Sequence, residues 1–300
     1  MEIFGVVGGD QRQLYLARAL EKKGNRVFLN GLETLEGAGD FTCLPLEELA
    51  QRCPVVLLPL PATRDGKTLQ APFSREPIPL GDGFARMLCH CQVLGGMVGK
   101  LRETSPLWES IALEDYYQRE ELTLGNAFLT AEGAVALAIQ QFPGSLGGSR
   151  CLVTGFGRIG KALCADLRGL GAQVDCCARK PWDLAAIRAL GCGPVTYDAI
   201  PGPYDMIFNT VPAAVLGEEP LSRQGPDTLL LELASAPGGI DRQAAERFHL
   251  SMVDAPSLPG RFSPKASGEL IAEAVLICWK KGGTTDEDLR ICHDRLLLHL

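Results

Sequence analysis

The chain has 300 residues, of which 46% are hydrophobic and 22% charged, a composition typical of a soluble globular protein. This length suggests two domains with separate cores. The net charge of −7 argues against nucleic acid or an anionic membrane as the main partner. The first residues lack the pattern of a signal peptide and no run is long enough to span a membrane, so we expect a cytoplasmic protein.

The eleven cysteines are scattered, without any CxxC pair. Zinc sites need spaced pairs of ligands, and only four histidines are present to complete one. We therefore predict reduced, structural cysteines and no metal.

The first predicted strand, residues 3–7, leads into Gly8-Gly9-Asp10, where Asp10 can cap a helix over residues 11–23. Arg12 lies in the first turn of this helix, a good place to hold a carboxylate. The alternative is that Arg12 is an ordinary surface residue of the helix.

Strands follow at residues 26–29 and 55–58, and a proline-rich loop that carries Thr63 follows the second of them. Open α/β sheets bind ligands at the carboxyl ends of their strands, so Thr63 is a candidate ligand contact. Further strand-like segments at residues 91–95 and 110–113 complete a first α/β domain, residues 1–125, which we expect to be the smaller one and flavodoxin-like.

A helix is predicted over residues 131–142, with Thr130 as its cap and Glu132 in its first turn. In many dehydrogenases such a helix joins two α/β domains and lines the cleft between them. Asn126, Thr130 and Glu132 are therefore candidate site residues. Simple capping would explain Thr130 and Glu132, but not Asn126.

A dinucleotide-binding pattern follows, in which the strand 151–154 leads through a glycine turn into the helix 161–170. The first glycine allows the tight turn, the second lets backbone N–H groups approach a pyrophosphate, and the third lets the helix pack on the strand. The unsatisfied N–H groups of the helix start favour phosphate. The predicted contacts are Gly155, Phe156, Gly157, Arg158, Ile159 and Gly160.

The end of the next strand, residues 173–177, indicates NADP as the cofactor. NAD-binding proteins carry an acidic residue there, but this chain has Ala178 followed by Arg179 and Lys180. A 2′-phosphate is repelled by a carboxylate and held by an Arg fork with a Lys beside it. The alternative is that both cations belong to a solvated strand end.

The second domain, residues 126–281, continues with a helix over residues 182–190 and strands at 205–209, 228–233 and 250–254. The loop that follows the first of these three strands should face the nicotinamide. It contains Asn209, Thr210, Val211 and Pro212. Ser235 follows the next strand, and Lys265 lies in a Pro-Gly-rich loop before a helix over residues 270–280. Residues 282–300 form a C-terminal tail. The fold class is α/β, with two doubly wound parallel sheets and a Rossmann-type C-terminal domain.

Several blocks occur together in one order along the chain and resemble the A subunit of dipicolinate synthase from spore-forming bacteria. They are Gly8-Gly-Asp-x-Arg12-Gln13, Pro59-Leu-Pro61 with Asp65-Gly66, Arg119-Glu-Glu121 with Asn126-Ala, Thr130-Ala-Glu-Gly133, Gly155-Phe-Gly-Arg-Ile-Gly160-Lys161, Asn209-Thr-Val-Pro-Ala213, Leu233-Ala-Ser235-x-Pro-Gly-Gly239 and Leu258-Pro-Gly-x-x-x-Pro264-Lys265. The resemblance runs from Gly8 to residue 281. Ala236, Arg261 and Ser263 depart from the family pattern.

The resemblance implies an NADP-linked oxidation, with loss of water, of hydroxy-tetrahydrodipicolinate or dihydrodipicolinate to pyridine-2,6-dicarboxylate during sporulation. It also implies a flavoprotein-like partner, the B subunit of dipicolinate synthase, and the mother-cell cytoplasm as location. We further expect an oligomer.

A ring with two carboxylates needs two anion holders, and Arg12 and Lys265 could supply them from opposite walls of a cleft. Thr63, Asn126, Thr130, Asn209 and Ser235 would be neutral partners. Glu132 and Lys265 are the candidate bases, because proton removal needs a base within hydrogen-bond reach.

Two other functions are compatible with this plan. A 2-hydroxy acid dehydrogenase would need a histidine base after the last strands, whereas His249 precedes the strand 250–254. A non-catalytic nucleotide-binding subunit is the second alternative.

Overall fold

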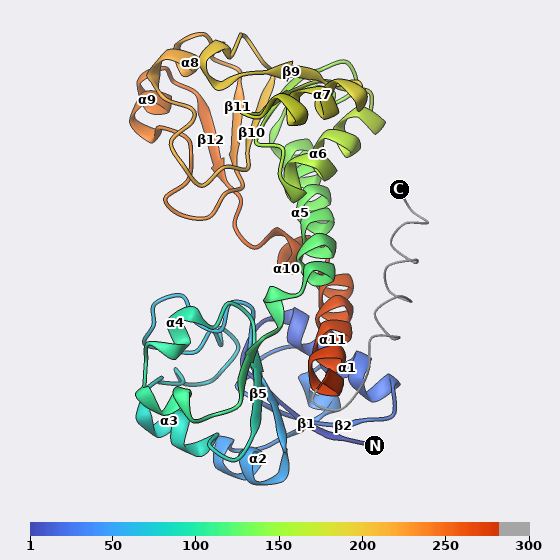
Figure 1. The fold of residues 1–300 in the computed structure, drawn as a ribbon, viewed down its shortest axis with the longest axis vertical. Coiled ribbons are helices and arrows are strands. Elements are labelled where there is room, and N and C mark those ends of the chain that lie inside the picture. Colours follow the sequence, from blue (N-terminus) through green and yellow to red (C-terminus); the bar gives the residue numbers. More distant parts are fainter. Residues whose placement is uncertain (282–300) are drawn as a thin grey trace. The chain divides into compact units, whose positions relative to one another are not determined.

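The computed structural model describes residues 1–281 and divides into two compact units. Among the described residues, the first contains 1–126 and 264–281, and the second is Ala127–Ser263 (Figure 1). The chain therefore passes from one unit to the other twice. The helix α11 (Pro264–Lys281) is grouped with the first unit, whereas the sequence analysis assigned it to the second domain. The tail predicted at residues 282–300 lies outside the described residues.

The sheet of the first unit has six strands, and every neighbouring pair is parallel. Its order is β3 (Thr42–Cys43), β2 (Arg26–Asn30), β1 (Ile3–Val7), β4 (Val55–Leu57), β5 (Gln92–Gly95) and β6 (Leu113–Asp115). Without the two-residue β3 this is the flavodoxin-like order, and with it the Rossmann order. The strand order reverses between β1 and β4, which is where such sheets bind ligands.

The sheet of the second unit is also six-stranded and parallel. Its order is β12 (Ser251–Asp254), β11 (Leu229–Glu232), β10 (Met206–Asn209), β7 (Arg150–Thr154), β8 (Gln173–Cys177) and β9 (Gly193–Val195). Counted from β7, this is the Rossmann order, with the reversal between β7 and β10. The predicted fold class, two doubly wound parallel sheets, is confirmed.

Both sheets are covered by helices on both faces, which explains why their strands read as continuous apolar runs. In β7, Cys151 and Val153 join one core and Leu152 the other, because successive side chains point to opposite faces. The first unit has helices α1 (Gln11–Lys22), α2 (Leu46–Arg52), α3 (Asp82–Met87), α4 (Gly99–Arg102) and α11. The second has α6 (Arg158–Gly169), α7 (Pro181–Ala189), α8 (Glu218–Ser222), α9 (Arg242–Arg247) and α10 (Leu258–Phe262).

The helix α5 (Glu120–Gln141) begins eleven residues before the predicted start. Gly125 lies inside the helix and packs on α11: a Cβ there would lie 2.8 Å from Cδ1 of Leu270. Within residues 1–281, α5 is the one helix with the length and apolar composition of a membrane span, contrary to expectation, but 56% of its most apolar stretch is buried. A core helix of a globular protein has the same properties.

All ten cysteines in the described part of the chain are free, and eight of them are buried. Burial raises the pKa of Cys177 to about 12 and that of Cys53 to about 12. Buried thiols of this kind behave as small apolar side chains. No group of three or more His, Cys, Asp or Glu side chains within residues 1–281 could hold a metal ion.

Candidate nucleotide and substrate sites

In the glycine turn after β7, two positions have no room for a side chain, and the third, Gly157, faces open space. Gly155 has φ +92°, and a Cβ there would lie 2.7 Å from Oγ1 of Thr210. A Cβ on Gly160 would overlap the carbonyl oxygen of Gly155. At Gly157, by contrast, nothing described lies within 4 Å of the added atom. This open space lies at the start of α6, where a ligand could approach the backbone.

The start of α6 can receive an anion. Gly157 is its N-cap residue, and no side chain caps the helix. The first amides of an uncapped helix lack intrahelical partners and carry a partial positive charge. Arg158 is exposed, Phe156 and Ile159 are half-buried, and Nζ of Lys161 lies 5.2 Å from the centre of the Phe156 ring. A pyrophosphate fits these donors and this space.

The carboxyl end of β8 carries cations where an NAD site has an acid. Ala178 is buried, whereas Arg179 and Lys180 are exposed. Nζ of Lys180 lies 5.3 Å from the ring centre of Trp182, which is 66% exposed. Asp175 is used elsewhere, since its carboxylate accepts a 2.8 Å hydrogen bond from the hydroxyl of Tyr204.

The ends of β7, β10 and β11 are joined by a buried chain of hydrogen bonds. Thr154 Oγ1 donates to Asn209 Oδ1 (2.5 Å), and Asn209 Nδ2 donates to Glu232 Oε1 (2.6 Å). Asn209 also exchanges hydrogen bonds with the backbone of Val211. Asn209 is 0% exposed, so its side chain holds the strand ends and is not presented to a ligand, unlike the direct contact that the sequence suggested.

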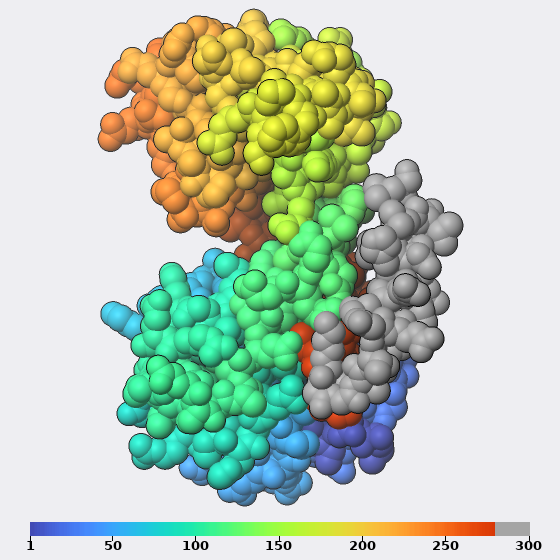
Figure 2. Space-filling model, viewed as in Figure 1, coloured from blue at the N-terminus to red at the C-terminus, as the bar shows by residue number. Residues whose placement is uncertain are grey.

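Glu232 is a site residue that the sequence analysis missed, although an acid directly after Leu229-Leu230-Leu231 is an unusual ending for a buried strand. It is 5% exposed. The loops around it reach the surface: Pro212 and Ser235 are exposed, and Thr210 and Val211 are half-buried. The yellow to orange part of the chain, which carries β10 to β12, forms much of the visible face of the second unit (Figure 2).

In the first unit, Arg12 is 5% exposed, so the alternative that it is a surface residue is wrong. Its Nε lies 2.9 Å from Oδ1 of Asp10, and its Nη2 lies 2.9 Å from Oδ2 of the same carboxylate. Nη2 also donates to the carbonyl oxygen of Leu60 (2.6 Å). Arg12 thus ties the loop after β1 to the loop after β4, at the point where the strand order reverses.

The Thr63 hydroxyl is used inside its own loop. It donates to the carbonyl oxygen of Thr68 (2.7 Å) and accepts from the backbone N–H of Gly66 (3.0 Å). The backbone N–H groups of Thr68 and Lys67 hold the pKa of Asp65 well below its usual value. Thr63 is 3% exposed and therefore shapes this loop from within.

Lys265 belongs to the first turn of α11 and is exposed. One turn later, Gly268 packs directly on α1, because a Cβ there would overlap the carbonyl oxygen of Arg12 and lie 2.7 Å from Cβ of Tyr15. Lys265 and Arg12 thus come from the first turns of two packed helices of the same unit. From the sequence alone, Arg12 and Lys265 are predicted on different domains.

The candidates on α5 lie inside the helix and not at its start. Nδ2 of the half-buried Asn126 donates to the hydroxyl of Tyr117 (3.4 Å). Thr130 is buried and Glu132 is exposed, and because α5 begins at Glu120, neither one caps it. Burial raises the pKa of Asp166 on α6, and the negative charge of Glu132 raises it further.

We expect Asp166→Asn to stabilise the protein at neutral pH. No donor among the described residues reaches Oδ2 of Asp166. A carboxyl whose folded pKa is raised binds more protons in the folded than in the unfolded state, so stability falls as pH rises from about 4 through the raised value. Thermal unfolding should give a higher midpoint for the variant at pH 7, and equal midpoints well below pH 4. Glu246→Gln, which changes an exposed carboxylate on α9, is the control; equal midpoints for Asp166→Asn and wild type at pH 7 would contradict the assignment.

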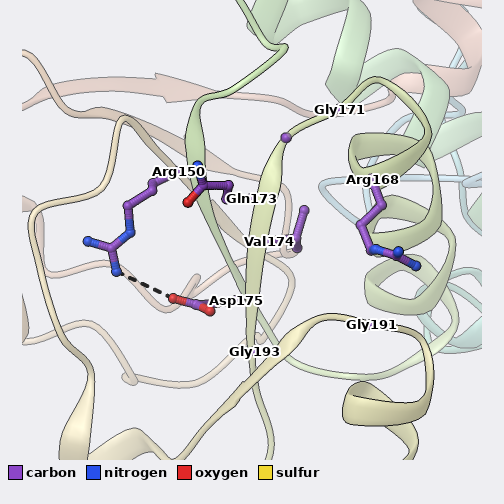
Figure 3. Close-up of a pocket in the computed structure, with 9 residues that line it drawn as sticks. Arg150, Arg168, Gly171, Gln173, Val174, Asp175, Gly191 and Gly193 are labelled. Carbon is purple, nitrogen blue, oxygen red and sulfur yellow. Dashed lines mark ion pairs between the residues drawn. The ribbon is translucent and has the colours of Figure 1, made fainter.

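A shallow cavity of about 570 Å³ lies at the opposite edge of the second sheet (Figure 3). It is lined by the starts of β7 and β8, where Arg150 pairs with Asp175 at 3.5 Å, and by Arg168 and Gly171. Ligands of open parallel sheets bind at the carboxyl ends of the strands, so we assign this cavity no part in the nucleotide site.

Two parallel sheets in Rossmann order, with an open glycine turn at the reversal point of the second, define a two-unit protein of the dinucleotide-binding α/β class. Residues 3–104 match the family described as the N-terminal domain of the dipicolinate synthase A subunit. The chain is 32% identical over 276 residues to the A subunit of dipicolinate synthase from Bacillus subtilis (strain 168), covering 90% of this chain and 93% of that protein. It belongs to the family of dipicolinate synthase A subunits.

Solved structures agree with this assignment. The dipicolinate synthase A subunit from Bacillus halodurans superposes with a TM-score of 0.81 at 28% identity, covering 92% of this chain and 97% of that one. A D-lactate dehydrogenase from Treponema pallidum superposes with a TM-score of 0.58 at 14% identity, covering 95% and 98% of the two chains. The second likeness shows the shared fold alone.

Proposed function

We propose that this protein oxidises hydroxy-tetrahydrodipicolinate, or its dehydrated dihydro form, to pyridine-2,6-dicarboxylate, with NADP as the hydride acceptor and the B subunit of dipicolinate synthase as partner. The observation that carries the proposal is the open space at Gly157, in a chain of this family. On either side, Gly155 and Gly160 have no room for a side chain. Sporulation, the mother-cell cytoplasm and an oligomeric assembly belong to the same proposal.

The residues present fit the cofactor. Gly157 and the first amides of α6 would hold the pyrophosphate, with Phe156, Arg158 and Ile159 beside it. Arg179 and Lys180 would hold the 2′-phosphate. The loop of Thr210, Val211 and Pro212 would lie along the nicotinamide half, because it leaves the sheet at the reversal point. When bound, the nicotinamide supplies the hydride acceptor.

The first unit would bind the dianionic substrate. Because the Arg12 guanidinium is neutralised by Asp10, Lys265 is the exposed cation of the predicted pair and the better holder of a carboxylate. Arg12 would then set the shape of the pocket floor through its bond to Leu60.

The oxidation releases one hydride and one proton, and the water is lost before it. Lys265 in its neutral form, or Glu132, would accept the proton. Asn126, Thr130 and Ser235 stay proposed as neutral hydrogen-bond partners of the ring substituents. Aromatisation of the ring supplies the driving force.

The 2-hydroxy acid dehydrogenase alternative needs a histidine at the site. His249 closely precedes the amino end of β12, whereas the glycine turn leaves the carboxyl end of β7 in the same parallel sheet. His249 therefore lies at the amino ends of the strands, away from the carboxyl ends where this chemistry would take place.

The proposal is tested by assaying the purified chain with NADP and substrate, with and without the partner protein, and by measuring both NADPH and pyridine dicarboxylate. Formation of both products in equal amounts supports the proposal. Nucleotide binding without turnover, whether or not the partner is present, would favour the non-catalytic alternative. Oxidation of simple 2-hydroxy acids would favour the dehydrogenase alternative.

We expect Arg179→Ala to weaken NADP binding by about 1.5–3 kcal/mol, the usual contribution of hydrogen bonds to a charged group, and to leave NAD binding unchanged. Titration calorimetry with both cofactors measures this difference. Arg188→Ala removes another arginine, from the last turn of α7, and is the matched control. Tighter binding of NAD than NADP by the wild type would show that the cofactor assignment is wrong.

A further inference from the structure

We propose that Glu232 is a positioning residue that holds the nicotinamide-side loops of the second unit in their binding shape. The inference rests on the proposed function, since it assumes that these loops meet the nicotinamide half of the cofactor. It concerns a buried side chain that touches no ligand and acts through two loops and the glycine turn.

The Glu232 carboxylate uses both oxygens to hold the loop after β11. Oε1 accepts the backbone N–H of Ala234 (3.1 Å), and Oε2 accepts those of Gly239 (2.9 Å) and Ile240 (3.1 Å). The loop is packed closely around it, because a Cβ on Gly238 would lie 2.9 Å from Oε2. One carboxylate therefore closes the loop 233–240 on itself.

A fourth hydrogen bond, from Asn209, connects the Glu232 carboxylate to the loop after β10. Oε1 accepts from Asn209 Nδ2, whose amide is then fully engaged: it donates to Glu232 and to the Val211 carbonyl (3.0 Å), and it accepts from Thr154 and from the Val211 N–H (3.2 Å). The carboxylate of Glu232 can only accept a hydrogen bond, so it fixes the orientation of the Asn209 amide, with Nδ2 toward Glu232. A Cβ on Gly239 would lie 2.6 Å from Asn209 Nδ2, so the two loops also touch directly.

The glycine turn is tied to the same network. Thr210, next to Asn209, donates from Oγ1 to the carbonyl oxygen of Thr154 (2.7 Å), and Gly155 packs against that hydroxyl. The loops after β10 and β11 and the glycine turn are thus one connected platform. Since a buried network loses more than one bond when a member is removed, Glu232 sets the geometry of the whole platform.

The cations at the end of β8 are not part of these hydrogen bonds, and this separation gives the test. Glu232→Gln keeps the side-chain shape but turns an NH2 group toward backbone N–H donors. We expect the NADP dissociation constant to rise about tenfold or more. The affinity for adenosine 2′-monophosphate, which lacks the pyrophosphate and the nicotinamide half, should stay within about twofold of wild type, because the cations proposed to hold its phosphate take no part in this network.

Thr154→Val removes one hydroxyl from the network with little change of volume, and it keeps the test usable if Glu232→Gln does not fold. It should weaken NADP binding by about threefold to tenfold, the effect of one neutral hydrogen bond, again without changing the affinity for adenosine 2′-monophosphate. Asp227→Asn, in an exposed position before β11, is the control.

Titration calorimetry of both ligands decides the matter. Selective loss of NADP affinity supports the positioning role. Unchanged affinity for both ligands, or an equal loss of both, would overturn it, since a purely structural residue would move both together. A wild type that binds neither NADP nor NAD would overturn the proposed function itself, and this outcome is visible before any variant is made.

Discussion

Gly157→Val is expected to weaken NADP binding by about 100-fold or more, or about 2.7 kcal/mol, while the protein stays folded. The backbone of Gly157 is extended (φ −83°, ψ −165°), which any residue adopts, and nothing described lies within 4 Å of an added Cβ. The side chain would instead fill the space proposed for the pyrophosphate and keep it from the first amides of α6. Titration calorimetry measures the loss, and thermal unfolding shows that the fold is retained.

Gly169→Val is the matched control, because Gly169 lies at the other end of α6 and its Cβ would also meet open space. This variant should bind NADP as the wild type does. Gly160→Val makes the opposite comparison: its side chain would overlap the Gly155 carbonyl, so we expect it to lose stability as well as binding. Normal NADP affinity in Gly157→Val would show that the pyrophosphate binds elsewhere.

Lys265→Ala is expected to lower turnover by about 100- to 10,000-fold, the range found when a group that transfers a proton is removed. Lys265 is exposed at the start of α11, one turn from the point where Gly268 packs on the backbone of Arg12. It is an exposed cation on a fixed support, which suits a group that must meet a carboxylate or a proton. Steady-state kinetics with purified protein, NADP and substrate measures the effect.

Two further measurements separate a role in the reaction from a general effect of charge. NADP affinity should not change in Lys265→Ala, because the proposed cofactor contacts all belong to the second unit. Lys22→Ala removes an exposed lysine from the last turn of α1 in the same unit and should leave turnover unchanged. If Lys265→Ala turns over like the wild type, the proton acceptor has to be sought elsewhere, with Glu132→Gln as the next variant.

Local patterns predicted most of the longer strands, and the starts of α1, α6 and α7 to within three residues, because their causes are local. The apolar run before Gly155, the glycine spacing and the capping box of Asp10 with Gln13 all depend on residues that are neighbours in sequence. The family resemblance has the same basis, since its blocks are short and ordered along the chain. The absence of an acidic residue after β8 was also predictable from the sequence, because the position is defined by the end of a single strand.

The helix α5 shows where local reasoning fails. The sequence predicted its start at residue 131, yet the helix begins at Glu120, and Gly125 inside it lies against Leu270, which is far away in sequence. The capping roles predicted for Thr130 and Glu132 followed from that misplaced start. Short elements such as β9 (Gly193–Val195) and α2 were missed for a related reason: pairing with neighbouring elements stabilises them more than their own sequence does.

By itself the sequence determined the fold class, the position of the glycine turn, the cations after β8 and the family. Only the tertiary structure decided which polar groups are engaged inside the fold. It paired Arg12 with Asp10 and Leu60, enclosed Asn209 between Thr154 and Glu232, and left Lys265 exposed. The physical reason is that a buried polar group must be paired, and the fold supplies its partners. Thr154 and Glu232 lie 55 and 23 residues from Asn209 in the sequence, and nothing in the spacing of the residues predicts these contacts.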